Sequence, residues 1–215
     1  SLTLGLLGLF LFYSPTLEQE TMQEQTDTLI ASIETGDGFI EVDQPVQDRA
    51  VDFYDEPAQG DPIPLDILPD LAEDDGVGEP SRTVTGIGIL EIPSIELKMP
   101  VSYGASETSL KVSAGWVSQT SSIGGFGNAV IAGHRNYAYG SHFNRLGELS
   151  SGDSIQYTPT EGETVQFIVT DTLDVLPGDP AAFEQPEDVQ MLTLYTCTPI
   201  HAATHRLLVR ATRVA

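Results

Sequence analysis

The chain has 215 residues, enough for one substantial hydrophobic core with appendages. Its 9 Lys and Arg residues stand against 32 Asp and Glu residues, and the formal net charge of −23 argues against a nucleic-acid partner, because phosphate binding needs a basic surface. The acidity is uneven. Residues 17–79 contain 19 acidic residues and one basic residue, whereas residues 80–215 contain 13 and eight. We therefore expect a solvated acidic segment followed by a separate packed domain.

The first residues are apolar. Almost every residue from Leu2 to Phe12 is hydrophobic, but this run is shorter than the roughly 20 residues that span a bilayer. We expect residues 1–13 to be the outer end of a truncated membrane anchor. A signal-peptide core is the alternative, although no small-residue cleavage site follows.

A helix is expected next. Ser14-Pro15 supplies a capping hydroxyl and a proline suited to the first helical position, and Gly36 and Gly38 supply a helix end. Residues 14–36 are therefore predicted to form an amphipathic helix that leaves the membrane.

Residues 37–82 combine many acidic residues with repeated prolines, which exclude a long helix or a central strand. Apolar residues are scattered among them, more than a plain linker would carry. We interpret this segment as a strap that lies on the following domain.

From residue 83 the pattern changes to short β-like runs punctuated by Gly and Pro. The predicted strands are 84–92, 97–101, 129–132, 154–158, 164–171, 190–196 and 205–212. Helical signal is limited to single turns at 108–111 and 142–147. This pattern predicts an all-β domain over residues 83–215, either a closed barrel or a sandwich.

Cys197 is the only cysteine, which excludes an intramolecular disulfide and a cysteine-rich metal site. It ends the predicted strand 190–196, where a side chain is held by a rigid element. A buried, inert thiol is the alternative. A reactive thiolate would need a proton donor, and His134 also follows a strand-like run.

Three further histidines, His142, His201 and His205, leave a zinc site open on count alone, but their spacing does not favour one. Arg206 begins the last predicted strand. A hairpin between the last two strands would bring it close to Cys197, where its guanidinium could stabilise an oxyanion, and a surface salt bridge is the alternative.

These residues lie within motifs that resemble the sortase family. The motifs are Ala132-Gly133-His134-Arg135, Thr193-Leu194-Tyr195-Thr196-Cys197-Thr198-Pro199 and Thr204-His205-Arg206-Leu207-Leu208-Val209. Framework segments at 88–95, 100–101 and 152–155 match as well. The resemblance covers about residues 84–214.

The resemblance implies an eight-stranded sortase β-barrel with short helices and a cysteine transpeptidase. Cys197 would attack a Leu-Pro-x-Thr-Gly-like sorting signal of a secreted protein, His134 would act as general acid and base, and Arg206 would stabilise the oxyanion or the substrate. The thioester would then pass to an amine. Thr196, Thr198 and His205 are further candidates for binding the substrate. No metal or cofactor is implied, and weak Ca²⁺ binding by the acidic strap stays open.

Two classes within the family compete. One anchors proteins to a peptidoglycan precursor of the cell wall, and the other joins pilin subunits through a lysine amine. Asp61-Pro62 resembles the lid motif of the pilin class, but Ile63 stands in place of its aromatic residue. Leu68-Pro69 begins like a sorting signal and is a second candidate lid element. Either class implies a location at the extracellular face of the cell membrane.

Rival functions remain. A plain cysteine protease would normally orient its histidine with Asn or Asp and release an acid. A wall-crosslinking transpeptidase is disfavoured, since its Ser-x-Gly-Cys pattern is absent. A third alternative is a non-enzymatic acidic module displayed at the cell surface.

Overall fold

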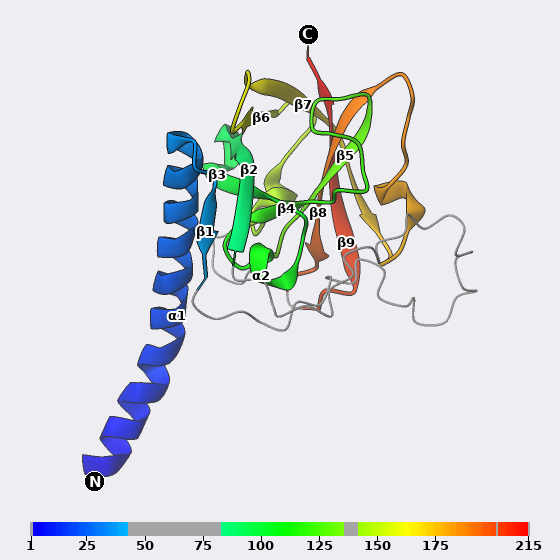
Figure 1. Ribbon diagram of the computed structural model, residues 1–215. Helices are drawn as coiled ribbons and strands as arrows, with labels where there is room; N and C mark the ends of the chain where they lie inside the picture. The colour runs from blue at the N-terminus through cyan, green and yellow to red at the C-terminus, as the bar shows by residue number, and fades with distance from the viewer. Residues whose placement is uncertain (1, 43–82, 136–141, 201, 215) are drawn as a thin grey trace.

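The computed structural model describes residues 2–42, 83–135, 142–200 and 202–214 (Figure 1). Eight strands close into a barrel in the order β2-β3-β4-β5-β8-β9-β7-β6, with β6 paired again to β2. Their bounds are β2 Thr83–Ile92, β3 Leu97–Tyr103, β4 Ala114–Trp116, β5 Gly127–Ala132, β6 Ser154–Pro159, β7 Val165–Val175, β8 Gln190–Thr198 and β9 His205–Arg213. The predicted closed eight-stranded barrel is confirmed.

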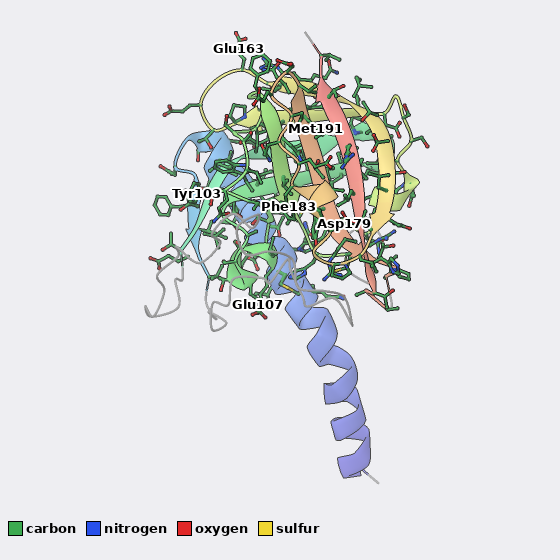
Figure 2. The ribbon with its side chains drawn as sticks, turned by 90° about the vertical axis from the view of Figure 1, so that its right-hand side faces the viewer. Tyr103, Glu107, Glu163, Asp179, Phe183 and Met191 are labelled. Carbon is green, nitrogen blue, oxygen red and sulfur yellow. The ribbon has the colours of Figure 1, made fainter. Side chains whose placement is uncertain are left out.

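Alternating side chains along each strand separate the barrel interior from its outer face. On β8, Leu192 and Leu194 point inward and are fully buried in the main core. Tyr195 instead belongs to a second apolar cluster with Leu208 and Ala182. This second cluster lies on the outer face, where the 3₁₀ helix η3 (Pro180–Ala182) covers the sheet and Phe183 packs against Tyr195 (Figure 2).

All seven predicted strands are present, and two three-residue strands were not predicted. These are β4 and β1 (Phe39–Glu41), which pairs antiparallel with the start of β2. Three residues are too few for a periodicity, and the Ala and Gly of β4 have low β propensity. The two predicted helical turns correspond to α2 (Glu107–Leu110) and the 3₁₀ helix η2 (Leu146–Glu148), while η1 (Pro93–Ile95) follows β2.

The helix α1 runs without interruption over Leu2–Thr35. The helix start predicted at Ser14-Pro15 is therefore wrong. A proline removes one backbone donor, and here the helix continues through that loss. The predicted end is correct, because Gly36 adopts a φ of +95° and its N–H bonds back to the carbonyl of Ser32.

The last turns of α1 pack against the barrel through a third apolar cluster that includes Leu29 and Ile33. Thr26 adds a buried hydrogen bond from its hydroxyl to the carbonyl of Val112, 3.0 Å away. Helix and strand approach so closely that a Cβ at Gly86 would lie 2.5 Å from Ile33 Cδ1. The earlier turns of α1 extend away from the barrel (Figure 1).

Among the residues that the structure describes, no helix has the length and apolar content needed to cross a membrane. The strap is described only as far as Val42, and its first residues form β1 at the edge of β2. The candidate lid residues Asp61, Pro62, Leu68 and Pro69 lie outside the described residues.

Candidate active site

Cys197 and Arg206 are direct partners across the antiparallel ladder of β8 and β9. Side chains of directly opposite residues share one face of a sheet, so the thiol and the guanidinium project from the same side. Cys197 is partly exposed, whereas Arg206 is only 6% exposed. Two hydrogen bonds orient its guanidinium, from Nη1 to the carbonyls of Ala203 (3.0 Å) and His205 (3.2 Å). A cation is therefore held in place on the same face of the sheet as the thiol.

His134 follows β5 at the same end of the barrel as Cys197 and Arg206. This end of the barrel is called the rim below. That strand runs parallel to β8, and their last paired residues are Ala132 and Tyr195. The Gly133 N–H continues the ladder by donating to the Tyr195 carbonyl at 3.1 Å. His134 and Cys197 each lie two residues beyond that last pair, so the parallel register brings the two residues to the same end of the barrel.

The surroundings of His134 shift its protonation equilibrium. Part of the residue is exposed, but the protein around the imidazole displaces water, and this desolvation lowers its pKa. The charge of Glu107 acts in the opposite direction, while that of Lys111 lowers the pKa further. Both residues come from the α2 region, and Figure 2 shows Glu107 at the end of the barrel opposite to Met191. The neutral imidazole is therefore favoured relative to an isolated histidine.

A second histidine, His142, lies close to the first. Its Nε2 is 3.0 Å from the carbonyl of Lys111, and the next residue, Phe143, donates its N–H to the carbonyl of His134 at 3.1 Å. Burial lowers the pKa of His142, the hydrogen bond to the carbonyl of Lys111 raises it, and the charge of His134 lowers it again. The segment that begins at His142 is thus attached both to Lys111, directly after α2, and to His134.

Arg135 follows His134 in the histidine motif, and the sequence alone predicted no role for it. Its guanidinium connects three segments of the rim. Nε donates to the carbonyl of Asn144 (3.3 Å), and Nη1 donates to the hydroxyl of Thr198 (2.9 Å) and the carbonyl of Cys197 (3.5 Å). A second arginine thus contacts the backbone of the candidate nucleophile. The sequence signal for it was a charged residue directly after a strand-end histidine.

The other predicted binding residues lie around this rim. The Thr196 hydroxyl donates to the carbonyl of Gly133 at 2.7 Å, and Thr198 accepts from the arginine described above, so both hydroxyls have partners within the fold. Both alternate with Cys197 along the strand and therefore face away from its side of the sheet. His205 is exposed, and its Nδ1 lies 3.0 Å from the hydroxyl of Thr204. Direct substrate contacts by these three residues stay predictions.

The described residues contain no group of three or more His, Cys, Asp or Glu side chains close enough to hold a metal ion. The rim instead combines a thiol, an imidazole and a buried guanidinium. These are the groups that nucleophilic acyl transfer needs: an attacking sulfur, a proton carrier and a positive charge for an oxyanion.

Comparison with known proteins shows which characterised proteins this chain is similar to. The family model described as "Sortase domain" matches residues 90–214. Sortase A from Bacillus anthracis is 30% identical over 141 residues, which cover 66% of this chain and 65% of that protein. The matched part is thus slightly less than two thirds of that relative's length.

Two solved structures extend the comparison. A Clostridium perfringens sortase D5 transpeptidase is 27% identical with a TM-score of 0.56, over 61% of this chain and 80% of the other. Sortase A from Corynebacterium diphtheriae is 28% identical with a TM-score of 0.60, over 94% of this chain and 86% of the other.

Proposed function

Because this chain belongs to the sortase family, we propose that it is a cysteine transpeptidase that cleaves a Leu-Pro-x-Thr-Gly-like sorting signal and transfers the new acyl end to an amine. Cys197 is the nucleophile, His134 the general acid and base, and Arg206 the oxyanion partner. The similarity to the C. perfringens sortase D5 transpeptidase supports acyl transfer over plain hydrolysis.

In the first half-reaction the thiolate of Cys197, with His134 protonated beforehand, attacks the carbonyl carbon of the threonine. The carbonyl oxygen takes up the electron pair and becomes an oxyanion beside Arg206. When the intermediate collapses, the C–N bond breaks and protonated His134 gives its proton to the departing glycine amine. The product is a thioester on Cys197.

The second half-reaction reverses these roles. An amine attacks the thioester carbon, neutral His134 accepts the proton that the amine loses, and the C–S bond breaks to release the thiolate. The result is an amide bond and a free enzyme. Since the pKa of His134 is lowered, only a minor fraction of the enzyme would carry the imidazolium near neutral pH.

The observation that carries this proposal is the register of β5, β8 and β9, which brings the three residues to one end of the barrel. Cys197 is directly opposite Arg206 on β9, and His134 lies two residues after the end of the parallel neighbour β5. A protein in which the lone cysteine were a packing residue would not need a buried guanidinium opposite it and a histidine on its other side. A barrel decayed into an acidic display module would not retain all three groups.

The test is product analysis with and without an acceptor. The protein is incubated with a peptide containing Leu-Pro-x-Thr-Gly, with water alone, with triglycine, or with a lysine-containing pilin-type peptide. Mass spectrometry is expected to find a new amide in an amine-containing reaction and a thioester on Cys197, both absent from Cys197→Ala. Release of only the free acid in every reaction would indicate a protease and contradict the proposal.

The two acceptors also distinguish the classes. Preference for triglycine would support attachment to a peptidoglycan precursor, and preference for the lysine peptide would support pilus assembly. A secreted substrate requires the enzyme at the extracellular face of the cell membrane, with the N-terminal segment as its proposed anchor. Fractionation of cells carrying the whole protein would test that location.

A further inference from the structure

The guanidinium of Arg135 lies on the side of β8 opposite to the face that carries Cys197. Its Nη1 bonds to the hydroxyl of Thr198, and Thr198 points to the side of β8 opposite to Cys197. The guanidinium is therefore separated from the thiol by the strand itself. It contacts the backbone of the nucleophile, through the Cys197 carbonyl at 3.5 Å, and not its sulfur.

The same guanidinium also holds the segment that supports His134. Its Nε donates to the carbonyl of Asn144, a buried residue directly after Phe143, and the Phe143 N–H binds the carbonyl of His134. One side chain thus connects the end of β8 to the loop that carries the histidine's backbone partner. The planar guanidinium suits this geometry because it directs several N–H groups along fixed directions.

Space around the guanidinium is restricted on the side of η2. A Cβ built on Gly147 would lie 2.7 Å from Nη2 of Arg135. A glycine at this position therefore lets the guanidinium lie directly against the backbone. Any larger residue there would displace the guanidinium without removing it.

From these contacts we propose that Arg135 is a positioning residue that sets the relative placement of Cys197 and His134, and this inference rests on the proposed function. Its bonds fix the ends of β8 and β5 at one spacing, so that proton transfer and sulfur attack occur in the same geometry. Errors of about 1 Å in such a geometry cost roughly a hundredfold in rate. A positioning residue of this kind touches no substrate and takes no part in charge transfer.

Three variants separate this role from general stability. Arg135→Lys keeps the positive charge but cannot reach Asn144 and Thr198 together. Thr198→Val removes only the hydroxyl, and Gly147→Ala displaces the guanidinium. Arg213→Lys is the matched control, because Arg213 donates to the carbonyl of Gly124 away from the rim residues.

Kinetics of transpeptidation are measured well below the melting temperature of each variant. We expect Arg135→Lys to lower kcat about ten- to a hundredfold with little change in KM, because geometry changes and substrate binding does not. Thr198→Val and Gly147→Ala should show smaller losses of the same kind. The double variant Arg135→Lys/Thr198→Val should be no slower than Arg135→Lys alone, since both remove one shared bond. Arg213→Lys should match the wild type.

Hydrogen exchange gives a readout that does not depend on activity. Peptides that cover 194–200 should exchange faster in Arg135→Lys than in the wild type and in Arg213→Lys. An Arg135→Lys variant with wild-type kcat, or with unchanged exchange at the end of β8, would overturn the proposal. If the wild-type protein transfers no acyl group, the proposed function fails, and the exchange comparison alone then decides whether Arg135 holds the end of the strand.

Discussion

Cys197 and Arg206 face each other across the β8–β9 ladder, and the guanidinium is buried while the thiol is partly exposed. The two carbonyls that accept from Arg206 Nη1 belong to Ala203 and His205, within its own strand and the turn before it. The cation is thus oriented by local backbone before any substrate arrives. Such preorganised donors stabilise an oxyanion more than mobile ones do.

Replacing Arg206 by lysine should therefore lower kcat/KM about a hundredfold or more, the range seen when a single oxyanion donor is lost. Lysine keeps the charge but has no fork to satisfy two carbonyls and an oxyanion together. Steady-state kinetics with a quenched fluorescent sorting peptide would measure the loss. Full activity in Arg206→Lys would contradict the assigned role, provided that circular dichroism shows a folded barrel.

The pH dependence of stability should carry a signature of the two rim histidines. Desolvation by the surrounding protein lowers the pKa of the exposed His134 and of the partly buried His142 below the ordinary value of about 6.5. Between the folded and unfolded values the unfolded chain therefore binds more protons. Their contribution is therefore fully present above the unfolded pKa and is lost as the pH falls through the folded pKa. Urea denaturation at a series of pH values from neutral to mildly acidic would measure the loss.

The variant His142→Gln provides the comparison for that series. The amide can still donate to the carbonyl of Lys111 but does not titrate. The loss of stability on acidification should be smaller in this variant than in the wild type. An identical or larger loss would mean that the histidine does not contribute.

Charges on α2 and just after it should move the histidine limb of the pH–rate profile in opposite directions. Glu107 raises the pKa of His134 and Lys111 lowers it. Glu107→Gln should therefore shift that limb to lower pH and Lys111→Met to higher pH. Each shift should shrink with added salt, because both groups are partly exposed. Shifts of the same sign in both variants would show that the limb does not report on His134.

The last turns of α1 should behave as part of the catalytic domain. Leu29 is fully buried against the barrel, so Leu29→Ala should lower the free energy of unfolding by about 2–5 kcal/mol. Lys98 on β3 forms a salt bridge of 2.8 Å with Glu34 of α1, but both side chains are about half exposed. Lys98→Met should therefore cost less than about 1 kcal/mol. Equal, small effects of both changes on denaturation would indicate that α1 is only loosely attached.

Much of this protein could be predicted from local patterns. Short β-like runs bounded by Gly and Pro located all seven of the longer strands, because each contains enough residues for such a run to be visible. The strand-end positions of Cys197 and His134 followed from the same reading. Gly36 marked the end of α1 because a positive φ at that position favours glycine.

What the tertiary structure decided depends on contacts between distant segments. The short strands β1 and β4 exist because neighbours supply their hydrogen bonds, and α1 continues through Pro15. The role of Arg135 required knowing that Asn144 and Thr198 meet at its guanidinium. The sequence by itself determined the lone thiol and its two chemical partners, since residue type and strand-end position are local. The register of these residues, the opposite effects of Glu107 and Lys111 on the pKa of His134, and the hydrogen bonds of Arg135 arise only when the barrel closes. Each depends on residues far apart in the chain.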